Sequence, residues 1–132
     1  MRIIIKVNEI RLLRTGPKNA YWNMALDEVL MKSIGKSTTE TPILRLYGWT
    51  PSAVSIGYFQ SVEQEVNTEF CKKTGVDLVR RVTGGGAVLH DSEVTYSFIT
   101  RKYPQNILDS YRMICDPIVA CLLKLGFKEP GL

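Results

Sequence analysis

The chain has 132 residues, of which 45% are hydrophobic and 23% charged, and its formal net charge is +4. This composition is that of one folded domain, or of part of one, and it excludes a disordered polypeptide. No apolar run approaches the roughly 20 residues that a membrane span needs, and the first residues lack the apolar core and cleavage site of a secretory signal. We therefore expect a cytoplasmic protein with no membrane partner.

The N-terminal third of the chain alternates strand-like and helical patterns. Two short strand-like runs lie within residues 3–13, and the cluster Thr15-Gly16-Pro17 breaks the pattern. Asn19 is expected to cap a helix that runs to about Ile34, with Gly35 just past its end. The polar segment 36–41 is predicted to be a loop.

The remaining elements follow the same signals. Residues 43–47 and 53–57 are predicted to be strands on either side of a turn at 48–51. Further along the chain we expect a short helix at 67–74 ended by Gly75, strands at 76–82, 87–90 and 94–100, and a long helix at 106–125 ended by Gly126. Pro117 lies inside the long helix and should kink or divide it.

The patterns of cysteines and of charged residues argue against several classes of function. Three cysteines without a C-x-x-C spacing, together with a single histidine, argue against a disulfide framework and against a zinc site. The basic residues are scattered apart from the pairs at 72–73 and 80–81, so they do not form the stripe that binds nucleic acid. The sequence therefore predicts neither a metal site nor a nucleic-acid partner.

The most informative segment is Arg80 to Asp91, which reads RRVTGGGAVLHD. Three successive glycines disfavour a strand, so their usual purpose is to let a ligand approach bare backbone. The N–H groups of such a turn suit a phosphate or another anion, and adjacent guanidinium groups add charge. The alternative is a mobile hairpin whose arginines face solvent. The turn leads into a strand and lacks the Gly-Lys-Ser/Thr that follows a phosphate-binding P-loop, and no Rossmann fingerprint is present.

Five sequence blocks occur in the order and spacing of one enzyme family. They are NMALDE at 23–28, LRLYGW at 44–49, VSIGYFQ at 54–60, RRVTGGGAVLHD at 80–91 and TYSFI at 95–99. Together these blocks resemble the lipoate–protein ligase and octanoyltransferase family, and they cover nearly the whole chain.

The resemblance implies an α+β fold with a mixed β-sheet flanked by helices. This catalytic domain is shared with biotin protein ligases and is related to class II aminoacyl-tRNA synthetases. The implied activity joins lipoate or octanoate to a lysine of lipoyl domains, which belong to 2-oxoacid dehydrogenases, or of the glycine-cleavage H protein. In the ligase branch, which is the leading expectation, ATP and Mg²⁺ first convert lipoate to lipoyl-AMP.

The resemblance also assigns residues to a substrate-binding site. The backbone N–H groups of Gly84, Gly85 and Gly86 are expected to hold phosphate or carbonyl oxygens, with Thr83 and Ala87 flanking them. We expect Arg81, which matches the family's binding arginine, to neutralise the developing charge.

Three further residues are assigned to the walls of this pocket. His90, which is the only histidine, is expected to shape the pocket wall rather than to act as a general base. Trp49 is expected to line an apolar tunnel, together with residues 54, 56 and 89, for which a place in the core is the open alternative. Gln60 is expected to supply a polar contact. For Asp91 we favour a turn-stabilising role, and for Asp27 and its neighbour a solvated face or a salt bridge.

Two departures from the family pattern matter. Ligases commonly carry Gly-Asn after the His-Asp pair, whereas this chain has Ser92-Glu93-Val94-Thr95, which is closer to the octanoyltransferase branch. The family's reactive lysine or cysteine would follow Leu132, so we expect no catalytic residue within the chain.

The chain is therefore expected to be the N-terminal part, residues 1–132, of a single catalytic domain. An incomplete domain exposes sheet edges and part of its core, so we expect it to self-associate or to bind a complementary C-terminal subunit. Two alternatives to the ligase stay open: an octanoyltransferase that uses an octanoyl carrier protein, and a non-catalytic subunit that binds lipoate or assists assembly.

Overall fold

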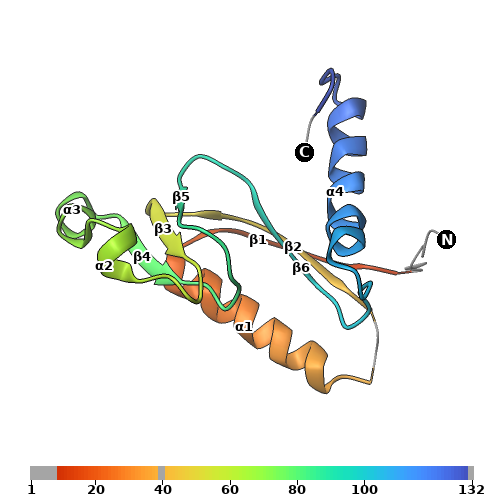
Figure 1. Cartoon of the computed structure of the whole chain (residues 1–132), viewed down its shortest axis with the longest axis horizontal. Coiled ribbons are helices and arrows are strands. Elements are labelled where there is room, and N and C mark those ends of the chain that lie inside the picture. The colour runs from red at the N-terminus through yellow and green to blue at the C-terminus, as the bar shows by residue number, and fades with distance from the viewer. Residues whose placement is uncertain (1–8, 39–40, 131–132) are drawn as a thin grey trace.

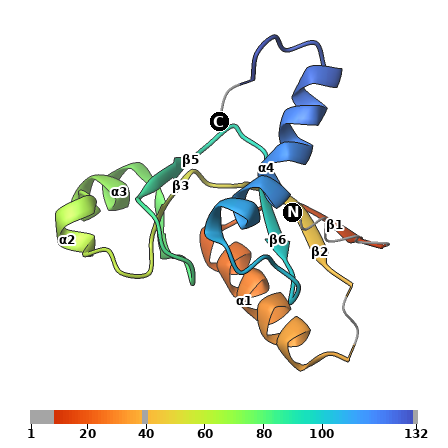
Figure 2. The same ribbon diagram turned by 45° about the vertical axis from the view of Figure 1, so that its right-hand side comes forward.

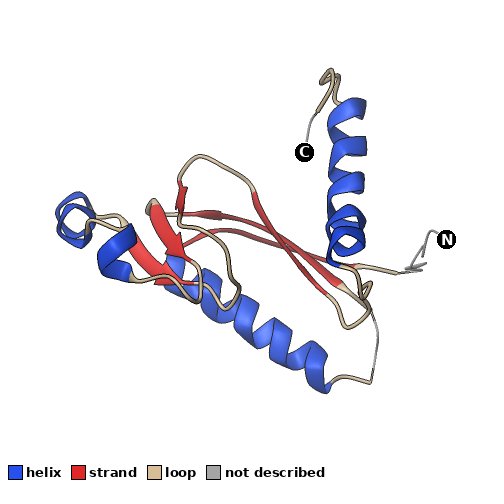
Figure 3. Cartoon of the chain, in the orientation of Figure 1, coloured by secondary structure: helices blue, strands red, loops and turns tan. Residues whose placement is uncertain are grey.

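The computed structural model of the chain describes residues 9–38 and 41–130. Their strands form two three-stranded sheets, in the orders β1-β2-β6 and β4-β3-β5. Each sheet combines one parallel and one antiparallel pair, and helices flank them (Figure 1, Figure 3). The expected α+β class is therefore confirmed, although the strands divide between two sheets.

The first sheet has β2 at its centre (Ile43–Trp49), with β1 (Arg11–Lys18) parallel to it and β6 (Thr95–Ile99) antiparallel. The break predicted at 15–17 is wrong, because β1 runs through it. The register of β1 on β2 shifts between Arg14 and Gly16, and Gly16 has a φ of 65°. A bulge thus absorbs the glycine without ending the strand. The earlier part of the predicted strand run, residues 3–8, lies outside the described residues.

The second sheet has β3 at its centre (Ala53–Ile56), between β4 (Asp77–Arg80) and β5 (Val88–His90). All three strands are found where the sequence predicted them, but they are shorter. The turn after β2 contains a cis peptide bond at Thr50–Pro51. The chain passes there from one sheet to the other, so β2 and β3 do not form a hairpin.

Helix α1 (Ala20–Lys36) contacts both sheets, through β4 and β6, and lies along one side of them in Figure 1. The predicted cap is confirmed, since the Asn19 side chain accepts a hydrogen bond from the Trp22 N–H at 2.8 Å. The predicted end is short by two residues, because the helix includes Gly35 and Lys36. The predicted loop that follows includes residues 39–40, which lie outside the described residues.

Three further helices complete the fold. The predicted helix α3 (Thr68–Thr74) is confirmed, with its cap at Asn67 and a left-handed Gly75 at its end. Helix α2 (Val62–Glu65) was not predicted. Helix α4 (Ile107–Lys124) is continuous through Pro117, so the predicted division of this helix does not occur.

The core is small and lies where α1 meets the sheets. Ala20, Tyr47, Trp49 and Ala53 form its buried cluster. Helix α4 contains no buried residue and projects away from the sheets in both ribbon views (Figure 1, Figure 2). The structural support of any site therefore comes from α1 and the two sheets.

Candidate acyl-binding site

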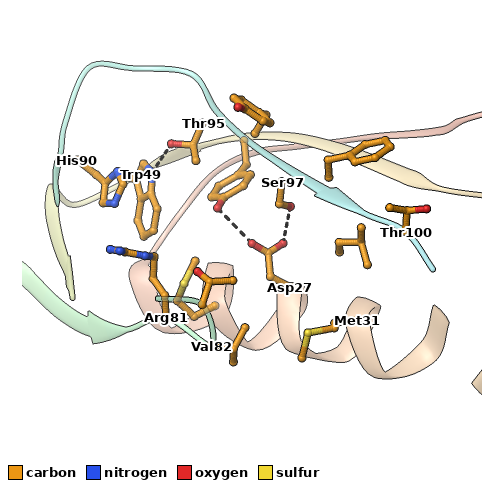
Figure 4. A pocket seen from close by; sticks show the side chains of 15 residues that line it. Asp27, Met31, Trp49, Arg81, Val82, His90, Thr95, Ser97 and Thr100 are labelled. Carbon is orange, nitrogen blue, oxygen red and sulfur yellow. Dashed lines mark hydrogen bonds between the residues drawn. The ribbon is translucent and has the colours of Figure 1, made fainter. Parts of the chain in front are cut away.

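A cavity of about 420 Å³ lies between α1 and the strands β2 and β6. This volume is within the roughly 300–1,000 Å³ of small-molecule pockets. Figure 4 shows that its length runs from Trp49, Arg81 and His90 at one end to Met31 and Thr100 at the other. The cavity is therefore elongated.

Most of the cavity wall is apolar. Its apolar side chains come from α1, from the segment after β4 and from β6: Met24, Met31, Val82 and Ile99. Methionine side chains adapt to irregular shapes, so such a wall can enclose a flexible chain. A groove of this form suits an aliphatic ligand whose polar head lies at the Arg81 end.

Two stacked rings form the wall at the polar end. The rings of Trp49 and His90 lie 4.0 Å apart between centroids, with an interplanar angle of 14°. The Trp49 indole N–H donates to Thr95 Oγ1 at 2.7 Å. His90 is buried, and its Nδ1 and Nε2 atoms contact Glu93 Oε1 at 2.6 Å and Ser55 Oγ at 2.7 Å. Both ring nitrogens are thus engaged within the protein, which fits the predicted wall.

Arg81 fixes the glycine loop, residues 83–87. Its Nη1 donates to the carbonyl and the hydroxyl oxygen of Ser55, both at 2.8 Å. Its Nη2 donates to the carbonyl oxygens of Gly84 at 3.2 Å and Gly86 at 2.8 Å. Burial lowers the pKa of this guanidinium. Arg81 therefore binds the loop itself, whereas the sequence suggested that its charge would face a ligand.

Arg80 plays the same part for the neighbouring loop, residues 57–60. Its Nη1 donates to the carbonyl oxygens of Gly57 and Tyr58 at 2.9 Å, and to that of Gln60 at 2.7 Å. The Gln60 side chain accepts a hydrogen bond from the Gly57 N–H at 2.8 Å. Both arginines of the pair thus bind backbone carbonyls, and they hold two adjacent loops at the end of β3.

A buried ion pair lies beside the cavity. Arg45 is fully buried, and its Nη1 donates to Asp27 Oδ1 at 2.7 Å. Asp27 also accepts from Ser97 Oγ at 2.9 Å and from the Tyr47 hydroxyl at 3.2 Å. Burial and the Asp27 carboxylate raise the pKa of Tyr47. The salt bridge expected for Asp27 is confirmed, and its carboxylate also lines the cavity.

The predicted site residues fall into two groups. Trp49, Arg81, Thr83 and His90 line the cavity together. The remaining predicted residues, Gln60, Gly84, Gly85, Gly86 and Ala87, lie in the two adjoining loops and do not line it. Of the residues suggested for an apolar tunnel beside Trp49, Ile56 is buried and Leu89 is 64% exposed, and neither lines the cavity. Substrate contact stays a prediction for every one of these residues.

The sequence did not assign Met24, Met31 or the β6 residues to the site. Met24 and Met31 are seven residues apart on α1, a helical spacing that places both on one face. The alternation of polar and apolar residues in β6 gave a second signal, because it places Thr95 and Ser97 on one face of the strand, and this face borders the cavity. Neither signal says that the two faces meet around a cavity rather than a packed core.

The described part of the chain has neither a group of metal ligands nor a helix that could cross a membrane. Within residues 9–38 and 41–130, no three side chains of His, Cys, Asp or Glu are grouped as metal ligands would be. None of the helices described there has the length and apolar character to cross a membrane.

A sequence model of the lipoyl protein ligase A/B catalytic domain matches residues 19–130. The chain belongs to this family. Among curated relatives, octanoyltransferase LipM of Kyrpidia tusciae is 49% identical over 122 residues, which cover 89% of this chain and 44% of that protein. Octanoyltransferase LipM of Bacillus subtilis is 38% identical over 126 residues, covering 92% and 43%. The chain thus spans less than half the length of these relatives.

Solved structures of the family share the fold. A bi-partite lipoate protein ligase from Thermoplasma acidophilum, studied with its E2 lipoyl domain, is 36% identical with a TM-score of 0.82, covering 93% of this chain and 48% of that one. Lipoate-protein ligase A bound with ATP is 37% identical with a TM-score of 0.80, covering 89% and 47%. The chain therefore has the fold of the part of these ligases that it matches, which is about half of each.

The contacts of Arg81 predict the effect of its removal. Arg81→Ala is expected to release the loop at 83–87, because four hydrogen bonds are lost from two backbone segments. Losing charge-assisted bonds of this kind costs about 1.5–3 kcal/mol. Hydrogen exchange of residues 83–87 should become faster. Arg81→Lys keeps the charge but lacks the planar fork, so it should also lose protection, and parental protection of residues 83–87 in either variant would contradict this role.

Proposed function

We propose that the chain is the acyl-binding half of an octanoyltransferase, which moves an octanoyl group from a carrier-protein thioester to a lysine of a lipoyl-acceptor domain. The observation that carries this proposal is the elongated apolar cavity with Arg81 committed to its own loop. An octanoyl thioester needs an apolar groove and, unlike an acyl-adenylate, has no phosphate bonded to its acyl carbonyl, so it does not require this guanidinium beside the carbonyl. The names of the curated relatives support the same branch.

In the proposed reaction, this chain binds and orients the acyl group. The octanoyl tail lies along Met24, Met31 and Ile99, and its carbonyl lies at the end formed by Trp49 and His90. Burial of the tail excludes water from the thioester. Overall, the acceptor lysine nitrogen bonds to the carbonyl carbon, the C–S bond breaks, and the proton leaves with the thiol.

None of the three cysteines lines the cavity: Cys71 is buried, and Cys115 and Cys121 lie on α4. We therefore propose that a nucleophile for transfer comes from the part of the family's domain that is represented in the relatives but not in these 132 residues. The solved bi-partite lipoate protein ligase offers a precedent for a protein of this family that consists of two parts.

The second candidate is an ATP-dependent lipoate ligase, which the solved neighbours favour. One of these holds ATP, and a Thermoplasma acidophilum protein 37% identical to the chain, with a TM-score of 0.82, holds lipoic acid. A lipoyl tail is also largely aliphatic, so the apolar wall of the cavity suits it as well. The residues present do not form a ready phosphate site, however, because the terminal nitrogens of Arg81 are bonded to protein oxygens and no acidic cluster offers Mg²⁺ ligands within residues 9–38 and 41–130. We therefore derive no step through ATP or Mg²⁺.

A binding comparison on the isolated chain separates the two candidates. We expect octanoyl-pantetheine to bind at least tenfold more tightly than a non-hydrolysable octanoyl-adenylate analogue, measured by calorimetric titration. The reverse preference supports the ligase and contradicts the transferase. In a parallel assay with a lipoyl domain, octanoyl transfer from carrier protein without ATP is the expected activity, supplied by the chain alone or with the C-terminal half of a relative. Binding of neither ligand contradicts both enzymes.

A further inference from the structure

Glu93 does not line the cavity, yet it contacts two of the residues that do. A single carboxylate oxygen, Glu93 Oε1, lies 2.6 Å from His90 Nδ1 and 2.6 Å from Thr95 Oγ1. Thr95 in turn accepts the indole N–H of Trp49 at 2.7 Å. The two rings that form the polar end of the cavity are thus held through one oxygen, on a side chain that is 36% exposed.

Proton positions in this network follow from counting donors and acceptors. Hydrogen bonds from Thr95 and His90 outweigh partial burial and hold the pKa of Glu93 below its usual value, so its carboxylate accepts only. His90 then carries a proton on Nδ1. Ser55 Oγ already accepts from Arg81, and its own proton is satisfied by donation to a bare His90 Nε2. The neutral Nδ1–H form of His90 is the one that satisfies every partner.

The Ser55, His90 and Glu93 side chains are arranged like a serine nucleophile with its base and orienting acid. This chemistry is excluded for Ser55 by its surroundings. Ser55 is 0% exposed and its hydroxyl oxygen faces the Arg81 guanidinium, so no acyl group can reach it. The same contacts connect Glu93 through His90 and Ser55 to Arg81. The arrangement therefore suits positioning.

We propose that Glu93 is a positioning residue for acyl binding, which fixes the Nδ1–H form of His90 and the orientation of Trp49 at the polar end of the cavity. This inference rests on the proposed function for its acyl ligand. Without the carboxylate, His90 Nδ1 and the Thr95 hydroxyl lose their shared acceptor, and the Trp49 indole loses a fixed partner. The Trp49 and His90 rings, which form the wall at the acyl carbonyl, are then no longer held in one orientation.

Glu93→Ala and Glu93→Gln test this role on the whole chain. Because His90 is the only histidine, isotope-edited NMR of its imidazole reports one tautomer without ambiguity. We expect the Nδ1–H form in the parent protein, a mixture or the Nε2–H form in Glu93→Ala, and a shifted Trp49 indole N–H signal. Octanoyl-pantetheine should bind about tenfold more weakly to Glu93→Ala, with Glu93→Gln in between.

Glu63→Gln is the matched control, because Glu63 is another glutamate that accepts a hydrogen bond from a hydroxyl, that of Ser61, and it does not line the cavity. It should change neither the imidazole spectrum nor the affinity. An unchanged tautomer in Glu93→Ala overturns the proposal, and so does a changed tautomer with parental affinity. If the parent chain binds no octanoyl ligand, the proposed function fails, while the imidazole spectra still decide whether Glu93 fixes the tautomer.

Discussion

Gly57→Ala is expected to displace the glycine loop and to destabilise the fold by about 2–3 kcal/mol. A Cβ added to Gly57 would overlap the carbonyl oxygen of Gly85 and would lie 3.0 Å from the Gly85 carbonyl carbon and 3.2 Å from that of Gly84. These are backbone atoms, so no side-chain rotation relieves the overlap. The loop must move away from β3, and the Arg81 hydrogen bonds to Gly84 and Gly86 are broken with it.

Urea unfolding measures the loss of stability, and octanoyl-pantetheine titration measures the effect on the cavity. We expect the variant to bind at least tenfold more weakly, since Arg81 and Thr83 line the cavity and move with the loop. Gly84→Ala is the control: it lies in the same loop, and a Cβ there meets nothing within 4 Å. Equal stability of the two variants would show that the loop is not seated on Gly57.

The close packing of Gly57 on Gly85 gives the glycines a second purpose. The sequence indicated that bare backbone at 84–86 admits a ligand. In the structure, the absence of a side chain at Gly57 lets the loop pack against this residue, and Arg81 donates hydrogen bonds to the loop. Two glycine segments, 30 residues or so apart in sequence, therefore pack on each other, and a pattern search within either segment alone does not show this.

Local signals predicted the helices well. Asn19 was predicted to be a cap, and Asn67 and Asn106 were predicted to begin their helices; each accepts a backbone N–H of the first helical turn. These contacts span two or three residues, so the local sequence is enough to predict where the helices begin. The break predicted at 15–17 was wrong because the pairing of β1 with β2, about 30 residues away, outweighs the local preference of glycine and proline.

The candidate site was predictable only in part, for the same reason. Arg81, Thr83, His90 and Trp49 could be assigned through the family pattern, and all four line one cavity. The partners that hold them could not, because the contacts of Arg81 with Ser55 and of Trp49 with Thr95 span 26 and 46 residues. Such contacts depend on how strands that are distant in the sequence pair within each sheet, which no local pattern describes.

Asp27→Ala is expected to destabilise the protein by about 3–5 kcal/mol, the usual cost of leaving a buried charge without its partner. Arg45 is 0% exposed, and the Asp27 carboxylate is the one acidic group paired with it among the described residues. The other acceptors of its guanidinium are uncharged oxygens of Asn23 and Thr15. The Arg45 guanidinium also lies 3.8 Å from the centroid of the Tyr47 ring, so its displacement would disturb the core beside the cavity.

The neighbouring carboxylate on α1 provides the control. Glu28 pairs with Lys32 at the surface, where such pairs contribute at most about 0.5 kcal/mol, so Glu28→Ala should unfold almost as the parent does. A double variant, Asp27→Ala with Arg45→Met, removes both charges and should recover much of the lost stability, because an apolar side chain costs nothing to bury. If Asp27→Ala and Glu28→Ala have the same urea midpoint, the Arg45 guanidinium is hydrated in solution, and the prediction that it is a buried charge is wrong. If the double variant is instead no more stable than Asp27→Ala, the loss comes from the hydrogen bonds to Ser97 and Tyr47 and not from the unpaired charge.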